Sequence, residues 1–214
     1  MSRFPGTDRF WEIVDGGQRL RYRCVASGQE RTIDQALVRP AGYRPGQEAA
    51  GAVSHEEIVC HLPALADLAP TPGDHIYTPD GRRFTVLSAQ LVAAGTRWRV
   101  HARDLVLAHG LDRHVRVEIL RWQRKPDGTV VGRWHTWKTG LRAAVSLWQA
   151  TTGSPTRRSY ERRYRVILEE CPPVDHVLRL CTPAGRILQV LSVHRADRVD
   201  SLPWVEAIEA DPDG

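Results

Sequence analysis

A Thr-Pro-x-Gly-Arg turn followed by an apolar strand occurs twice in this chain. The first copy reads Thr78-Pro79-Asp80-Gly81-Arg82 before Phe84-Thr85-Val86-Leu87-Ser88, and the second reads Thr182-Pro183-Ala184-Gly185-Arg186 before Leu188-Gln189-Val190-Leu191-Ser192. Proline presets φ for a turn, and glycine supplies the backbone conformation that closes it. Both copies therefore predict strand, tight turn, strand, with Gly81, Arg82, Gly185 and Arg186 as structural residues of the hairpin.

The repeat continues upstream of the turn. Asp74-His75-Ile76 precedes the first copy and Asp175-His176-Val177 the second, with a spacing of 101 residues at the Asp-His pair and 104 after it. Recurrence at equivalent positions is natural in a duplicated fold and odd for a single active site. Both histidines are therefore predicted to start matching strands, and both aspartates to be turn or strand-entry residues.

Each half has the same order of strand-like runs with the alternation of a half-buried strand. They span residues 19–25, 32–38, 55–62 and 97–101 in the first half, and 114–120, 137–148, 164–168 and 204–208 in the second. Five or six short strands per half, counting the hairpin, favour a mainly β fold with minor α. The prediction is two similar small antiparallel β-barrel or sandwich domains, each with a long loop or short helix.

Polar stretches with glycine and proline interrupt both halves at 39–54 and 149–160. Helical turns are expected inside them, at 47–52 and 159–163. A short helix is expected at 102–109, stopped by Gly110, where one domain should hand over to the next. The predicted domains are residues 1–110 and 111–214.

Composition excludes several protein classes. With 214 residues, 42% apolar and 26% charged, the chain is long and apolar enough to bury a core. No apolar run approaches the roughly 20 residues of a membrane span, and the N-terminus lacks the apolar region of a secretion signal. The four cysteines form no CxxC pair, so reduced thiols are expected and a metal site is not. They are Cys24, Cys60, Cys171 and Cys181.

Charge is distributed unevenly along a chain whose net charge is +5. Residues 111–165 hold thirteen basic and four acidic side chains, whereas residues 166–214 hold four basic and nine acidic ones. This asymmetry predicts opposite fields on different surfaces, which suits head-to-tail packing of identical copies or a basic face toward a polyanion.

The sequence lacks the motifs of the common enzyme classes. GxSxG, Walker, HExxH and strand-linked GxGxxG patterns are absent, so neither an enzyme nor a cofactor is predicted. Four tryptophans surround the first strands of the second half, at positions 122, 134, 137 and 148. They are expected to fill a core or an oligomer contact. The alternative is a stacking platform for single-stranded nucleic acid, beside an arginine cluster at 157–163.

The order of features in the second half matches a known pattern. It comprises a strand at 114–120, Asp127-Gly128, Trp137 before a second strand, small and apolar residues at 143–147, Gly153, a polar stretch to Arg163, a Tyr164-Arg165-Val166 strand, a hairpin at Gly185 and a strand at 188–193. This half resembles the head-tail joining proteins of tailed bacteriophages, also called head-tail adaptors or head-completion stopper proteins. The resemblance covers most of residues 111–210, and the first half joins it through the internal repeat. A tandem copy departs from the usual single-domain member.

The resemblance implies a structural protein of the virion neck. Such proteins form a homo-oligomeric ring beneath the portal, extend the DNA channel, help retain packaged double-stranded DNA, and offer a surface to the tail. The polar stretches 39–54 and 149–163 are then expected to face the channel or the neighbouring subunit. Their candidate contact residues are Arg44, Gln47, Arg157, Arg158, Arg162 and Arg163. The alternatives are a nucleic-acid-binding barrel acting alone and another neck or tail component such as a tail terminator.

Overall fold

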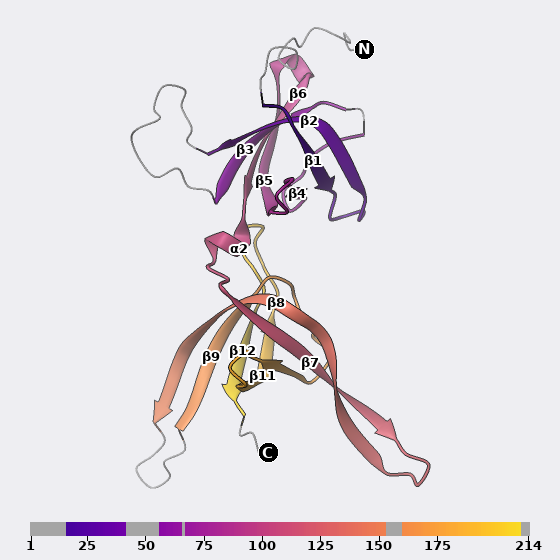
Figure 1. The fold of residues 1–214 in the computed structure, drawn as a ribbon, viewed down its shortest axis with the longest axis vertical. Helices are drawn as coiled ribbons and strands as arrows, with labels where there is room; N and C mark the ends of the chain where they lie inside the picture. The colour runs from indigo at the N-terminus through magenta and orange to yellow at the C-terminus, as the bar shows by residue number, and fades with distance from the viewer. Residues whose placement is uncertain (1–15, 42–55, 66, 153–159, 211–214) are drawn as a thin grey trace. The chain divides into compact units, whose positions relative to one another are not determined.

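The computed structural model describes residues 16–41, 56–65, 67–152 and 160–210, with the backbone alone at 149–152, 160 and 161. The chain forms two compact units (Figure 1). Unit 1 comprises residues 1–108 with 198–200, and unit 2 comprises residues 109–197 with 201–214. The division at 108 falls close to the boundary expected at 110.

Both units are closed six-stranded antiparallel barrels, as the mainly β prediction required. The strands of unit 1 are β1 (Gln18–Arg23), β2 (Glu30–Pro40), β3 (Glu57–Pro63), β4 (His75–Tyr77), β5 (Arg83–Val92) and β6 (Arg97–Arg103). Those of unit 2 are β7 (Arg113–Arg124), β8 (Val130–Thr152), β9 (Tyr160–Leu168), β10 (Leu178–Cys181), β11 (Ile187–His194) and β12 (Trp204–Glu209). The helical segments are η1 (Ala93–Gly95) and α2 (Leu105–Ala108), the latter inside the helix expected at 102–109.

The two barrels have one topology. The cyclic order is β1-β2-β3-β6-β5-β4 in unit 1 and β7-β8-β9-β12-β11-β10 in unit 2, so each strand has a counterpart six places along. The registers agree as well, because Tyr22 pairs with Ile76 as Val117 pairs with Leu180. The internal repeat detected in the sequence is therefore a repeat of the fold.

The duplicated Val-Leu-Ser of the opening motif carries the same irregularity in both barrels. Pairing with the next strand shifts between Val86 and Ser88 in β5 and between Val190 and Ser192 in β11. The leucine between them is thus the extra residue of a β-bulge. A bulge bends its strand and raises the local twist, which a sheet of six short strands needs in order to close.

The repeated segments also supply the cores. Phe84 and Val86 are buried in the first barrel, and Leu188 is buried in the second with Val190 packed against the core. Each core is mainly aliphatic, with Tyr22 and Phe84 in the first and Tyr164 in the second, and is built from the inward positions of all six strands. The alternation that predicted half-buried strands is confirmed in β3, whose residues alternate between partly and fully buried.

The Asp-His pairs, by contrast, do not occupy matching places. His75 lies in β4 and pairs with Arg23, but His176 precedes β10, where Arg179 takes the corresponding place by pairing with Glu118. Leu178, at the start of β10, corresponds to Asp74. The prediction that both histidines start matching strands is therefore wrong. Equivalent residues of β4 and β10 are 104 positions apart, whereas the two histidines are 101 positions apart.

The polar stretch expected at 149–163 is shorter than predicted. β8 continues to Thr152 and β9 begins at Tyr160, and the two strands pair from Ala143–Leu168 to Thr152–Tyr160. The helical turn expected at 159–163 is wrong from residue 160 onward, because strand pairing with β8 satisfies this backbone. The turn expected at 47–52 lies outside the described residues.

The Asp74 carboxylate links three segments of the first barrel, at Tyr22, Val25 and Thr71, through hydrogen bonds. This carboxylate, 2% exposed, accepts hydrogen bonds from the Tyr22 hydroxyl, the Val25 N–H at 2.9 Å, and the N–H and hydroxyl of Thr71 at 2.9 and 2.7 Å. Burial alone disfavours the charged form, but these donors outweigh it and keep the pKa of Asp74 below its ordinary value.

Replacing Asp74 with Ala should destabilise the first barrel by about 3 kcal/mol, because several buried donors lose their acceptor. Urea unfolding combined with peptide-resolved hydrogen exchange measures this and assigns the loss to a barrel. Asp34→Ala is the control, since the Asp34–Arg19 pair is exposed and should contribute less than about 0.5 kcal/mol. Equal losses in the two variants would contradict the role given to Asp74.

His75 makes the first barrel sensitive to acid. Burial, together with the charges of Arg83 and Arg23, lowers the pKa of His75 to about 4, and the charge of Asp74 only partly opposes this. Since the unfolded chain takes up this proton near pH 6.5, stability is complete above that pH and is lost as the pH falls toward 4. The loss by pH 4 should stay below about 3 kcal/mol, the value that the full shift corresponds to, because solvent screens this half-buried ring. A His75→Gln variant should show a flatter profile in urea unfolding, and His176→Gln, at an exposed site, an unchanged one.

Candidate functional site

Each barrel opens at its mouth into a pocket below the Thr-Pro-x-Gly-Arg turn. The pocket of the first barrel has a volume of about 300 Å³ and that of the second about 590 Å³. The strand registers place their lining residues at equivalent positions. These pairs are Gln18 and Arg113, Val38 and Val145, Ile58 and Tyr164, Arg82 and Arg186, and Phe84 and Leu188. Duplication has therefore copied a cavity together with the fold.

The turn above each pocket has the same geometry. The Gly81 N–H donates to the Thr78 carbonyl at 2.9 Å and the Gly185 N–H to the Thr182 carbonyl at 3.0 Å. Both glycines have positive φ, 83° and 79°, which a side chain would strain. Gly81 and Gly185 thus lie at the closing position of the hairpin, as the sequence predicts.

The arginine of each turn reaches a carboxylate at the end of the barrel's last strand. Arg82 contacts Asp104 through Nε and a terminal nitrogen, both at 3.1 Å, and its guanidinium lies 4.7 Å from the Phe84 ring centre. Arg186 lies 3.9 Å from Glu209, with its side chain 58% exposed against 32% for Arg82. The first barrel therefore holds its arginine firmly, and the second leaves it close to solvent.

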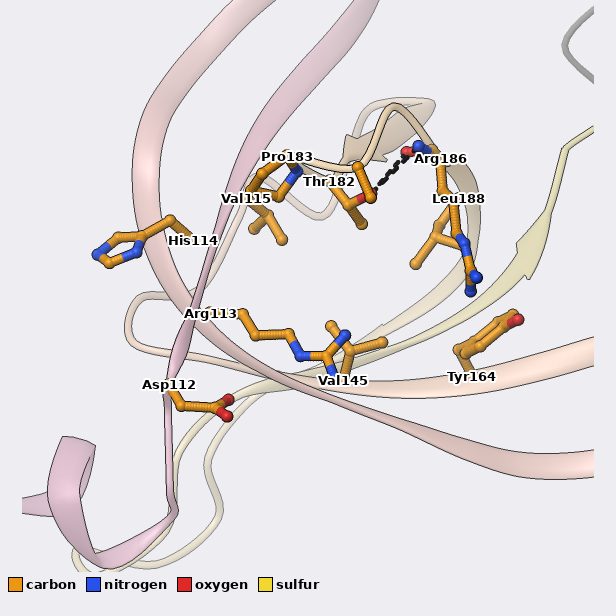
Figure 2. A pocket seen from close by; sticks show the side chains of 11 residues that line it. Asp112, Arg113, His114, Val115, Val145, Tyr164, Thr182, Pro183, Arg186 and Leu188 are labelled. Atoms are coloured by element: carbon orange, nitrogen blue, oxygen red, sulfur yellow. Dashed lines mark hydrogen bonds between the residues drawn. The ribbon is translucent and has the colours of Figure 1, made fainter.

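The pocket of the second barrel is the more cationic one. Figure 2 shows Arg113 extending across the opening toward Val145, with Arg186 and Tyr164 on the opposite side. The Tyr164 hydroxyl donates to Glu209 at 3.2 Å, and the Thr182 hydroxyl is occupied by the backbone of Arg186. This arrangement favours anionic groups at the mouth, with Asp112 as the opposing charge among the lining residues.

The predicted contact residues have different outcomes. Arg44, Gln47, Arg157 and Arg158 lie outside the described residues. Arg162 and Arg163 lie in β9, not in a loop, because the strand begins at Tyr160.

Both of these arginines face acidic partners on β12. Arg163 pairs with Glu206 at 3.0 Å, and Arg162 approaches Glu209 at 3.9 Å. They are thus partly neutralised within their own barrel.

Acidic and basic segments that are distant in the sequence lie side by side in the second barrel. The acidic strand β12 pairs with the basic strand β9, Lys138 of β8 contacts Glu170, and Arg179 of β10 contacts Glu118 of β7 at 2.6 Å. For β9 and β12 the expectation of opposite fields on different surfaces is therefore wrong, because antiparallel pairing places these two strands side by side.

Cations without an acidic neighbour gather on a projection of the second barrel. β7 and β8 continue past the barrel as a two-stranded hairpin, whose tip we call the arm, residues 120–134 (Figure 1). A turn closes it, in which the Lys125 N–H donates to the Thr129 carbonyl at 2.8 Å and Asp127 accepts from Thr129. This confirms the turn at Asp127-Gly128, although the strands on both sides are longer than predicted.

The root of the arm is fixed by an ion-pair network. Glu118, 7% exposed, is held by Arg179 at 2.6 Å and by Arg116 at 2.9 Å, and Arg179 lies 4.3 Å from the Trp134 ring centre. Burial opposes ionisation of Glu118, but the Arg179 hydrogen bond and the two guanidinium charges outweigh it and lower the pKa of the carboxyl. The arm thus leaves the barrel in a defined direction.

Two of the five tryptophans of the second half, Trp122 and Trp148, are exposed, and the other three are half-buried. Trp122 is 66% exposed and lies over Gly132, its cross-strand partner, where an added Cβ would meet the indole at 2.9 Å. Of the four predicted core or contact tryptophans, Trp137 packs against the core. A core role for Trp122 and Trp148 is wrong, because Trp122 lies where β7 has left the barrel and Trp148 lies at the irregularity between Leu147 and Gln149, beside Trp204.

A second exposed aromatic group lies where β8, β9, β11 and β12 run together. Trp148, 55% exposed, meets Trp204 edge-on at 5.8 Å, and His194 stacks on Trp204 at 3.7 Å between ring centres. Arg165 lies 4.5 Å from the same ring. Sequence reasoning missed this cluster because its four members come from four strands, although the exposed run Leu147-Trp148 was visible beside the polar stretch.

Other classes of site find little support in the described part of the chain. There, no group of three or more His, Cys, Asp or Glu side chains is placed to hold a metal ion. All four cysteines are free thiols, and burial raises the pKa of Cys60 to about 12. No described helix is long and apolar enough to cross a membrane.

Compared with protein families, with curated proteins and with solved structures, the chain gives no match.

The two turn arginines should respond differently to the same substitution. Arg82→Ala should lower the stability of the first barrel by about 1 to 2 kcal/mol, because it deprives the buried Asp104 of its cation. Arg186→Ala should change the second barrel by less than about 0.5 kcal/mol, since its contact is long and exposed. Hydrogen exchange of the two barrels in each variant measures both values. A larger effect at Arg186 than at Arg82 would contradict this assignment.

Proposed function

We propose that this chain is a structural protein of the neck of a tailed bacteriophage, which assembles as a ring of identical copies between head and tail. In this role it extends the DNA channel, contacts the portal or an adjoining neck protein on one side and the tail on the other, and helps to retain packaged DNA. The proposal rests on the resemblance of the second half to head-tail joining proteins together with the geometry of the projections.

The single observation that carries the proposal is that two strand pairs of the second barrel, β7–β8 and β8–β9, continue past the rest of the barrel. The arm and the paired ends of β8 and β9 beyond Arg163 both extend past the other strands. Trp122 and Val130 are exposed on the arm, and Leu147 and Trp148 are exposed on β8 beside the second extension. Exposed apolar side chains on such projections are typical of surfaces that a partner covers. A contact between unlike patches of identical copies closes into a ring when the rotation permits.

The barrels themselves suit a scaffold. Closed sheets have no free edge except at projections, so a barrel is a rigid support from which projections can reach a neighbour. Because the two barrels have the same topology, each subunit carries two supports of the same kind.

The proposal is tested by particle assembly with and without the chain. Phage particles produced without it should fill their heads, fail to join tails, and lose DNA to added nuclease, and the supplied protein should restore joining. Electron microscopy of restored particles should locate the chain as a ring in the neck. Tailed, nuclease-resistant particles lacking the chain would overturn the proposal.

A matched pair of variants tests the contact surface. Leu147→Ser with Trp148→Ser removes exposed apolar surface without touching the core, and should reduce ring formation and tail joining at least tenfold while the barrel stays folded. Val174→Ser, at another exposed apolar position of the same barrel, should leave both unchanged. Equal behaviour of the two variants would remove the assigned contact.

One observation favours a second candidate, a nucleic-acid-binding barrel acting alone. Trp122 and Trp148 are exposed near arginines, as in proteins that stack single-stranded bases. A monomer with tight, salt-dependent affinity for short single strands would support this candidate, whereas weak binding by the monomer is expected of the ring protein.

A further inference from the structure

The arm extends beyond every strand that could support it except its own partner. β10 pairs with β7 through Ile119, and in the described structure only β8 pairs with β7 beyond Leu120. Residues 121–130 are all exposed. Such an extension adds little to the core of the barrel, so its side chains are available to another molecule.

The arm has two different faces. Cross-strand partners share a face. Leu120 pairs with Trp134 and Trp122 with Gly132 on one face, which is apolar up to the Arg124–Val130 pair beside the turn. Arg121 pairs with Arg133 on the other, which is cationic. His135, the next residue on this second face, has a buried Nε2 without a hydrogen-bond partner among the described residues.

The Arg121–Arg133 pair places two like charges directly opposite each other. Side chains in such pairs have Cβ atoms roughly 5 Å apart, and like charges at this spacing destabilise a hairpin. Within the described residues neither arginine has an acidic partner. The nearby acids are engaged, Glu118 by Arg116 and Arg179, and Asp127 by Thr129. The cost of this pair is relieved when an anion binds between the two guanidinium groups.

We infer that the cationic face of the arm binds backbone phosphates of duplex DNA, with Arg121 and Arg133 as the phosphate-binding pair. Planar guanidinium groups bind phosphate oxygens in pairs, and two-stranded β-ribbons fit the major groove of B-form DNA. Lys125, in the turn at the tip and without an acidic partner in the described structure, adds positive charge next to this face, whereas Arg124 pairs with Val130 on the opposite face. The choice of DNA as the polyanion rests on the proposed function.

Fluorescence anisotropy with a 30-base-pair duplex of arbitrary sequence tests this inference on the full chain. Arg121→Gln with Arg133→Gln removes two phosphate contacts. It should weaken binding about 60-fold at 0.1 M monovalent salt and reduce the slope of log K against log salt by about 2. Arg142→Gln with Arg195→Gln, two exposed arginines of the same barrel outside the arm, is the control with equal charge change. Equal losses in both double variants would overturn the inference.

A second variant separates binding from folding. Arg133→Glu places opposite charges across the arm, so hydrogen exchange of the arm amides should slow while DNA affinity falls by at least the same factor. Faster exchange together with lost binding would mean that Arg133 acts only through arm structure, and would overturn its role in binding phosphate.

A 30-nucleotide single strand distinguishes phosphate binding from base stacking. Duplex should bind at least as tightly as single strand, and Trp122→Ala should change duplex affinity less than threefold. Tighter single-strand binding that Trp122→Ala abolishes would overturn the inference in favour of stacking. Absence of duplex binding by a chain that still forms rings would overturn it while leaving the neck assignment intact. Arm-dependent duplex binding by a chain that is absent from the neck would support the inference and overturn the neck assignment.

Discussion

Closure of a small sheet on itself is the constraint on which the rest of this structure depends. Six antiparallel strands, some of only three or four residues, must bend enough for the last to pair with the first. The bulged leucine of the repeated Val-Leu-Ser bends β5 and β11, and the glycine turn returns the chain from β4 and β10 at the required twist.

Much of this fold could be predicted because its signals are local. Alternation in β3, the turn at Gly81 and Gly185, and the Asp127-Gly128 turn are properties of neighbouring residues, and the repeat located the first of these turns twice. The register of β4 against β10 could not be predicted in this way. Asp74-His75 resembles Asp175-His176 in sequence, but pairing with β1 and β7 selects Leu178 and Arg179 as the counterparts.

The candidate site was less accessible to sequence reasoning. The sequence marks the turn arginines, but their carboxylate partners, Asp104 after β6 and Glu209 at the end of β12, are distant in the sequence and carry no local signal. Arg162 and Arg163 were read as loop residues because polar composition is typical of loops, whereas neighbouring acids on β12 make the same residues compatible with a strand. The cationic face of the arm depends on the pairing of Arg121 with Arg133, which only the hairpin register reveals.

The arm also affects the tendency of newly synthesised copies of this protein to aggregate. Beyond the barrel, β7 and β8 each have one backbone edge without a neighbouring strand in the described structure, next to exposed indole and valine side chains. Such edges attract other strands and promote aggregation. Arg121, Arg124, Lys125 and Arg133 repel an identical arm, so newly made copies are kept apart until another molecule neutralises that charge.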